Sequence, residues 1–473
     1  MRKFAAFALA AVVTAGCRDN TEVNPVDAPS ATALQGALTR ASLQTLAAGV
    51  LAQDRSATTS TFTFYTLSEI YGRDAYRIDA SEPRYVSETL GGQPEAGSFA
   101  GSGGFAAFYT AIRAGNTLIL AIPGTPTNQA SAVEKSATLG FLRTIKALDY
   151  LRLIELRDTV GISIQTDDQA AITDIRCKPA VLNYIAALLD SAQTDLNTAG
   201  SATALPFKLP SGFTAFGRDY SKVSNILLFN RALKGKVDYY RALNRQSPQA
   251  ALYPTAIAEL TTALGGAAPG SVPASQLPVG PYYVFVPGGT EASPNPISDT
   301  RIGLNPLVAD SLQAGDTRGS KIVSRSTLTG AAPFQSVTTS ITYFGAVSSL
   351  ANQARPIGIL RDEELVLLRA QAYIETSQFA NAAADINSVR AAYGLAPIAV
   401  TSIAQGRTVV LREKRYSLLF EGPQRLVDLR AYGYLNATYL RAETATDPFN
   451  SAFPIPQPER DARGNYVVGA CTA

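Results

Sequence analysis

The sequence predicts a mainly α-helical fold of helical pairs, with a loop-rich irregular insertion that contains short β segments. Apolar residues recur at helical spacing through residues 34–245. Gly, Pro, Ser and Thr dominate residues 246–356, and helical periodicity returns in residues 357–435, before a C-terminal tail of residues 436–473. We therefore expect one large helical body over residues 34–473.

The N-terminus, MRKFAAFALAAVVTAGC, has the pattern of an export signal over residues 1–16. Its apolar stretch is shorter than the roughly 20 residues of a membrane-spanning helix. TAGC resembles a bacterial lipobox, in which cleavage makes Cys17 the lipid-attachment residue. The alternative is an ordinary secretory signal with an incidental cysteine. Residues 17–33 are polar and contain two prolines, which predicts a flexible tether.

The composition excludes several kinds of chemistry. The chain has no histidine, which excludes Ser-His-Asp and Cys-His catalysis and nearly all ordinary transition-metal sites. We expect no catalytic residue, no cofactor and no metal. Without Arg2 and Lys3 the mature chain has 39 basic and 38 acidic side chains, so no strong field attracts nucleic acid. Tryptophan is absent, so aromatic recognition depends on 21 tyrosines and 19 phenylalanines.

The chain has three cysteines. If Cys17 carries lipid, Cys177 and Cys471 remain. They would form a disulfide in an oxidising exported compartment, or they are two free buried thiols. Spacing alone does not decide between these alternatives.

The stretch RDEELVLLRAQAYIETSQFANAAADINSVRAAYGL predicts two antiparallel helices. A tight turn at residues 376–378 joins them, and Gly394 suits the C-terminal end of the second helix. Alanines at the close approach make the pair tetratricopeptide-like. The repeat period does not recur cleanly, so we expect degenerate pairs; a plain helical hairpin is the alternative.

Two stretches are candidate ligand faces because they mix tyrosines with charged or polar groups. The first, LSEIYGRDAYRIDASEPRYVSETLGG, contributes Tyr71, Arg73, Asp74, Tyr76, Arg77 and Tyr85. Its alternative is a packed loop with capping charges. The second, PYYVFVPGG, contributes Tyr282 and Tyr283, and its alternative is a short strand buried on both sides.

Carboxylate pairs were tested as glycosidase candidates, because those enzymes use two acids at a defined separation. Glu363 and Glu364 are neighbours on a predicted helix, and Asp167 and Asp168 lie in a polar loop. No surrounding pattern would raise the pKa of one member of either pair. We interpret all of them as solvated surface acids.

The stretch LREKRYSLLFEGPQRLVDLRAYG, residues 411–433, is crowded with charges. Gly and Pro break its helix directly after Glu421. We expect Arg415 or Arg425 to pair with Glu421 or Asp428 there, which makes these four residues a structural element that closes the helical body.

This stretch is part of a whole-chain resemblance. The lipobox, the tether, FYTAIRAGNTLILAIP, FLRTIKALDYLRLIELRDTVGI, the helical pair, LREKRYSLLFEGPQRLVDL and a final FPIPQPER follow one another in this order. Together they resemble the SusD/RagB outer-membrane lipoproteins. The resemblance implies a surface lipoprotein, anchored in the outer membrane. Its helices would form an α-superhelix of tetratricopeptide-like helical pairs, and its irregular part would carry the ligand face.

In that family the ligand is an oligosaccharide, in some cases a peptide, handed uncut to a SusC-like TonB-dependent receptor. The resemblance transfers no ligand-binding residue, because the family's sites share no motif. The alternative function is a tetratricopeptide-like envelope scaffold lipoprotein that binds protein partners.

Overall fold

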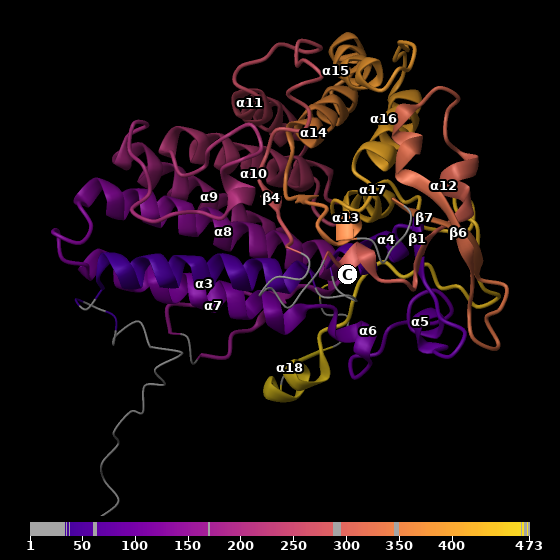
Figure 1. The fold of residues 1–473 in the computed structure, drawn as a ribbon, viewed down its shortest axis with the longest axis horizontal. Coiled ribbons are helices and arrows are strands. Elements are labelled where there is room, and N and C mark those ends of the chain that lie inside the picture. Colours follow the sequence, from indigo (N-terminus) through magenta and orange to yellow (C-terminus); the bar gives the residue numbers. More distant parts are fainter. Residues whose placement is uncertain are drawn as a thin grey trace, which may run out of the picture.

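The computed structural model describes residues 34, 36, 38–59, 64–168, 171–286, 295–344, 350–464, 466–467 and 471. The predicted signal, residues 1–16, and the tether, residues 17–33, lie outside the described residues, and so does the lipid-attachment prediction for Cys17. Helices dominate the described residues and the strands are short, which confirms the predicted fold class (Figure 1).

The body is a run of helices in which each helix packs on the next, from α3 and α7 at the left of Figure 1 to α14 and α15 at the upper right. In Figure 1, α3, α7, α8, α9 and α10 lie side by side, and α14 and α15 follow beyond α11. The bounds of these helices are α3 Arg40–Thr59, α7 Phe105–Ala121, α8 Ala132–Arg157, α9 Lys178–Ala199, α10 Val223–Leu243, α11 Tyr253–Ala263, α14 Asp362–Glu375 and α15 Phe379–Ala392.

Local sequence explains where these helices begin and which face they bury. Ser131 and Glu134 form a capping box at the start of α8. The predicted apolar stripe of α8, including Phe141 and Ile145, is buried. Three acidic residues in the first turn of α14 face the positive end of the helix dipole. Gly394 has a φ of 79° directly after α15.

Among the described residues, three α-helices lie where the sequence predicts loops, and two of them, α12 (Pro306–Asp310) and α13 (Leu350–Gln353), have five residues or fewer. Helix α11 falls inside residues 246–356, and it packs between α10 and α14. Its buried residues Tyr253, Ala256, Leu260 and Ala263 keep helical spacing, a stripe too short to stand out against the surrounding Gly and Pro. The superhelix is therefore continuous, and the irregular part begins after α11.

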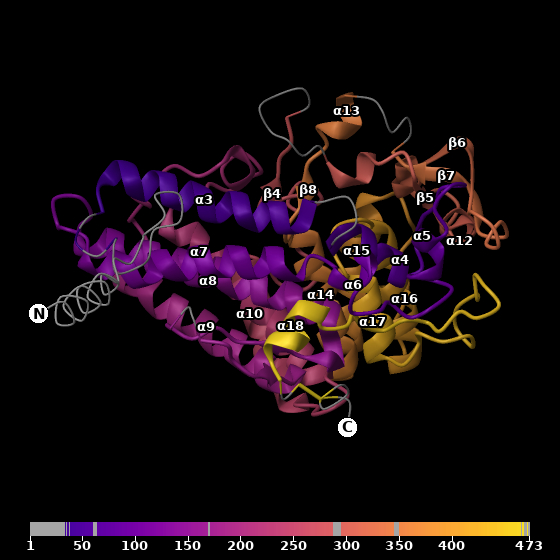
Figure 2. The same ribbon diagram turned by 90° about the horizontal axis from the view of Figure 1, so that it is seen from below.

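The irregular part is fastened by two-stranded antiparallel sheets. Strand β1 (Ala75–Arg77) pairs with β5 (Ile302–Leu304), and β4 (Tyr282–Tyr283) pairs with β8 (Ile357–Gly358). Figure 2 places α13 (Leu350–Gln353), β4 and β8 along one edge of the molecule. The other sheets are β2 with β3 and β6 with β7, with bounds Ile162–Ser163, Ile175–Arg176, Ile322–Thr329 and Thr338–Tyr343.

The remaining helices complete the body around these sheets. Helices α16 and α17 follow α15, and α18 lies in the C-terminal tail (Figure 2). The bounds are α4 Phe64–Tyr71, α5 Arg84–Ser87, α6 Phe99–Ser102, α12 Pro306–Asp310, α16 Ile403–Ser417, α17 Gln424–Ala431 and α18 Gln457–Ala462. Among the described residues, the helical segment 100–124 is apolar and long enough to cross a membrane. However, 56% of its most apolar 18-residue stretch is buried inside the protein, as expected of a core helix.

A disulfide joins Cys177 to Cys471. Cys177 is the residue directly before α9. The bond closes a sequence separation of 294 residues and ties the tail to the start of α9. Of the two alternatives that the sequence leaves open, the structure contains the bonded one.

The buried Lys146 of α8 gives the fold a pH dependence that can be measured. Its Nζ donates a hydrogen bond to Asn116 Oδ1 at 2.7 Å, and burial lowers the pKa of Lys146 to about 8. An unfolded lysine keeps the ordinary pKa of 10.5, so the folded state binds fewer protons between these values. The free energy of unfolding therefore rises with pH between about 8 and 10.5. Below about pH 8 the protein carries the full cost of burying the charged lysine.

We expect Lys146→Met to raise the free energy of unfolding at neutral pH by about 1–3 kcal/mol. The gain should shrink as the pH approaches 10.5, the unfolded value. Denaturant unfolding at several pH values measures it, with the exposed Lys208→Met as the control. A gain independent of pH would show that side-chain packing, not charge burial, is the cause.

Candidate ligand-binding site

The first candidate face is mostly interior. Tyr71, Asp74 and Tyr76 are each at most 2% exposed, and the Tyr71 ring stacks on Phe453 with centroids 4.3 Å apart. Arg73 is buried in an ion pair with Asp447. These contacts are those of the packed loop that was the alternative interpretation.

Arg77 of the same stretch also has protein partners on both sides. Its Nε donates to Asp299 Oδ2 at 3.1 Å, and its guanidinium carbon lies 3.9 Å from the ring centre of Tyr85. Tyr85 is half-buried. Ligand contact by Tyr85 stays a prediction.

The two tyrosines of the second candidate face point to opposite sides, as strand alternation predicts. Tyr283 is 3% exposed, and its hydroxyl donates to Asp54 Oδ2 at 2.6 Å. Tyr282 is half-buried and stacks on Phe216, with centroids 4.2 Å apart and an interplanar angle of 24°. Tyr283 therefore belongs to the core, and Tyr282 is the one that reaches a pocket.

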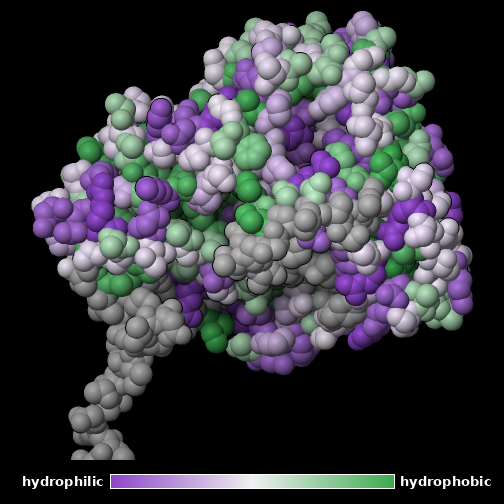
Figure 3. Space-filling model, in the orientation of Figure 1, coloured by the Kyte–Doolittle hydropathy of each residue, from purple (hydrophilic) through white to green (hydrophobic). Residues whose placement is uncertain are grey.

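This pocket, which we call the loop pocket, has a volume of about 250 Å³. It lies beside β4 and β8, where the irregular part meets the residues that follow α16. Figure 3 shows the face that carries β4 and α13, on which hydrophilic and hydrophobic side chains are interspersed. The aromatic and charged residues that line it include Tyr282, Lys321, Tyr343, Phe344, Arg355, Arg361, Tyr393 and Glu421.

Aromatic rings and charged groups share the wall of the loop pocket. Phe344 has a φ of 57°, which is strained for a non-glycine residue, and Arg355 lies 3.4 Å from its ring centre. Arg361 holds Glu421 with two hydrogen bonds, of 2.6 and 2.8 Å. Ring faces offer apolar contact area and the charged groups offer directed hydrogen bonds, a combination that suits a hydroxyl-rich ligand.

Sequence reasoning named Tyr282 as a ligand candidate and Glu421 only as a structural residue, and it missed Tyr343, Phe344 and Arg355. The available signal was the aromatic pair at the end of the β-like run QSVTTSITYFG. The part of the chain that the structure describes holds no cluster of three or more His, Cys, Asp or Glu residues suited to a metal.

Comparison with solved structures identifies the fold. The chain aligns with a SusD homolog from Bacteroides thetaiotaomicron at a TM-score of 0.64 and 15% identity, over 91% of this chain and 98% of that one. The fold is SusD-like. A SusD superfamily protein from Parabacteroides distasonis aligns at 0.62 and 14% identity, over 89% of this chain and 98% of that chain.

A third structure was solved with a ligand. Surface glycan-binding protein A from Bacteroides thetaiotaomicron, in complex with laminarihexaose, aligns at a TM-score of 0.63 and 13% identity. The alignment covers 90% of this chain and 98% of that one. No family model matches the sequence, and no curated protein matches it.

The signature stretch supplies buried ion pairs to this SusD-like fold, but not the pairs expected from sequence. Arg415 and Arg425 both bind Asp74, at 2.7 and 2.9 Å. Glu421 binds Arg361, and Asp428 binds Lys414 at 2.5 Å. The expected pairing of Arg415 or Arg425 with Glu421 or Asp428 is therefore wrong, because both arginines face the loop after α4. Glu421 pairs with Arg361, outside the stretch, and Asp428 pairs with Lys414, inside it.

The interpretation of Glu363 and Glu364 as solvated acids is also wrong, since both are at most 2% exposed. Glu363 binds Arg361 at 2.7 Å, and Glu364 lies 3.0 Å from Lys236 Nζ. Burial acts to raise the pKa of Glu363, but Arg361 and Lys321 outweigh it and lower that pKa.

Asp167 and Asp168 are exposed, as expected. Neither of the two tested carboxylate pairs therefore has the arrangement of a glycosidase acid and base.

We expect Asp74→Asn to lower the free energy of unfolding by about 3 kcal/mol, because two partly buried arginines lose the buried carboxylate that compensates their charge. Denaturant unfolding measures the loss. The exposed Asp174→Asn is the matched control and should leave the midpoint unchanged. Equal midpoints for both variants would contradict a structural role for the signature stretch.

Proposed function

We propose that this chain is a cell-surface binding lipoprotein that captures an oligosaccharide in the loop pocket and delivers it to a TonB-dependent outer-membrane transporter. The observation that carries the proposal is the pocket itself, where Tyr282, Tyr343 and Tyr393 surround charged groups in the irregular part of a SusD-like fold. The glycan complex of a structural neighbour supports an oligosaccharide over a peptide.

Tyrosine rings take the place of tryptophan in this proposal. A half-buried ring presents a flat apolar face to the C–H groups of a sugar. Two contacts fix the orientation of Tyr282. Phe216 stacks on its ring, and its hydroxyl donates a hydrogen bond to Pro278 O at 2.6 Å. A ring fixed in this way loses little conformational entropy when a ligand binds.

The loop pocket binds its ligand without cutting it. Glu421 is the one carboxylate among the described residues that line the pocket. Glycoside hydrolysis ordinarily requires two carboxyl groups across the scissile bond, one of them free to give or take a proton. Both oxygens of Glu421 accept hydrogen bonds from Arg361, so this carboxylate is engaged by the protein, and no second carboxylate of the described lining faces it.

We expect Tyr282→Ala to weaken binding of the preferred glycan roughly 5- to 150-fold, the loss of about 1–3 kcal/mol that a stacked ring contributes. Isothermal titration of a neutral glycan panel that includes laminarihexaose measures the effect. Tyr439→Ala is the matched control, because Tyr439 is 59% exposed and lies outside the loop pocket. Equal affinities for both variants, or a protein that binds no glycan, would contradict the proposal.

The anchor and the partner are tested with the full-length protein in its membrane. Cys17→Ala should move the protein from the membrane fraction to the soluble fraction, because no acyl chain is attached. In mild detergent the unaltered protein should co-purify with a large TonB-dependent β-barrel. Recovery with other envelope proteins and without that barrel would favour the scaffold function instead.

A further inference from the structure

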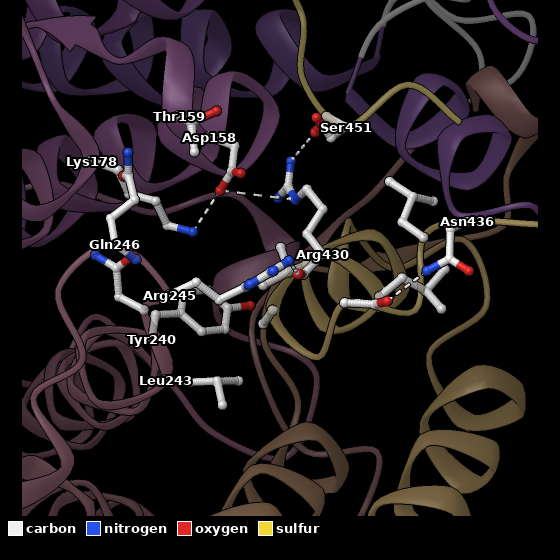
Figure 4. A pocket seen from close by; sticks show the side chains of 16 residues that line it. Asp158, Thr159, Lys178, Tyr240, Leu243, Arg245, Gln246, Arg430, Asn436 and Ser451 are labelled. Carbon is white, nitrogen blue, oxygen red and sulfur yellow. Dashed lines mark hydrogen bonds and ion pairs between the residues drawn. The ribbon is translucent and has the colours of Figure 1, made fainter. Parts of the chain in front are cut away.

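A second cavity, which we call the junction cavity, has a volume of about 740 Å³. It lies where the end of α8, the start of α9, the end of α10 and the residues after α17 meet (Figure 4). It shares no lining residue with the loop pocket. Its volume is within the ~300–1,000 Å³ typical of ligand sites.

Positive charge prevails in the junction cavity. Lys178 Nζ lies 2.5 Å from Asp158 Oδ1, and Arg430 Nε lies 3.9 Å from the same oxygen. Figure 4 shows Lys178 and Arg430 converging on the Asp158 carboxylate, with Arg245 beside Arg430. The described lining thus contains one carboxylate and three cationic side chains, so the cavity favours an anion.

Arg245 is the cation with capacity left for a ligand. Its side chain is exposed, and one guanidinium nitrogen, Nη1, donates to Arg430 O at 3.2 Å. Its other N–H groups make no hydrogen bond to any described residue. By contrast, Arg430 donates hydrogen bonds from Nη1 to Ser451 O and from Nη2 to Glu155 O.

The backbone at Asp158 fixes this arrangement. Asp158 has a φ of 44° and a ψ of −120°, a strained conformation for a residue other than glycine. The strain persists because Lys178 and Arg430 hold the carboxylate between them. The carboxylate keeps these two cations in place at the cavity wall while leaving Arg245 unengaged.

The rest of the wall offers apolar contact. Leu243, Leu429 and Leu435 line the cavity beside Tyr240. A ligand that meets these groups carries a carboxylate and an apolar face.

We propose that the junction cavity is a second ligand site, which takes a carboxylate-bearing sugar, a uronate, with Arg245 binding its carboxylate. The inference rests on the proposed function for the sugar part of the ligand. The carboxylate part follows from the charge of the cavity.

Methyl glucuronide and methyl glucoside test the proposal, because they differ only in a carboxylate that replaces a hydroxymethyl group. Ligand-observed NMR at low ionic strength measures both affinities. We expect the unaltered protein to bind the glucuronide roughly tenfold more tightly, the effect of one charge-assisted hydrogen-bonded contact. Arg245→Gln should abolish this preference.

Arg113→Gln is the matched control, because Arg113 is also exposed and lies outside both cavities, and it should keep the preference. Equal affinity of the unaltered protein for the two sugars, or a preference that survives Arg245→Gln, would overturn the junction site. Loss of neutral glycan binding in Tyr282→Ala reports on the loop pocket, so a failure of one proposal is distinguishable from a failure of the other.

Discussion

The bidentate pairing of Arg361 with Glu421 is the interaction on which the site depends. Arg361 directly precedes α14, and Glu421 follows α16, so the pair connects two segments 60 residues apart. Arg361 also binds Glu363 and the backbone oxygen of Ser417. A buried guanidinium with these partners is stable only while all of them remain in place. The pair therefore sets the floor of the loop pocket at the same time as it closes the helical body.

Helix periodicity sufficed to predict the helical elements, because apolar stripes such as that of α8 are long and regular. It failed for α11, whose stripe is short and is followed by Gly265 and Gly266. It also failed for the partners of buried charges. Asp74 and Arg415 are 341 residues apart in sequence. No local pattern encodes such a contact, because it exists only once the helical pairs have stacked.

The same limit applied to the sites. The tyrosines and charges between Tyr71 and Tyr85 suggested a binding face. In the structure most of them are buried, and Tyr71 and Arg73 contact the C-terminal tail. The loop pocket takes Tyr282, Tyr343 and Arg355 from three separate segments. The junction cavity had no sequence signal, because its cations come from the ends of helices that only tertiary packing brings together.

The double position of Glu421, in the fold and in the pocket wall, constrains how the protein can change. A substitution there disturbs the loop pocket and unseats Arg361 together, so selection for a new ligand would act against folding. Tyr282, Phe344 and Arg355 lie on the other part of the wall and do not bind the Arg361 side chain. Ligand preference can therefore diverge among descendants of this chain at the rim of the pocket, while its floor stays unchanged.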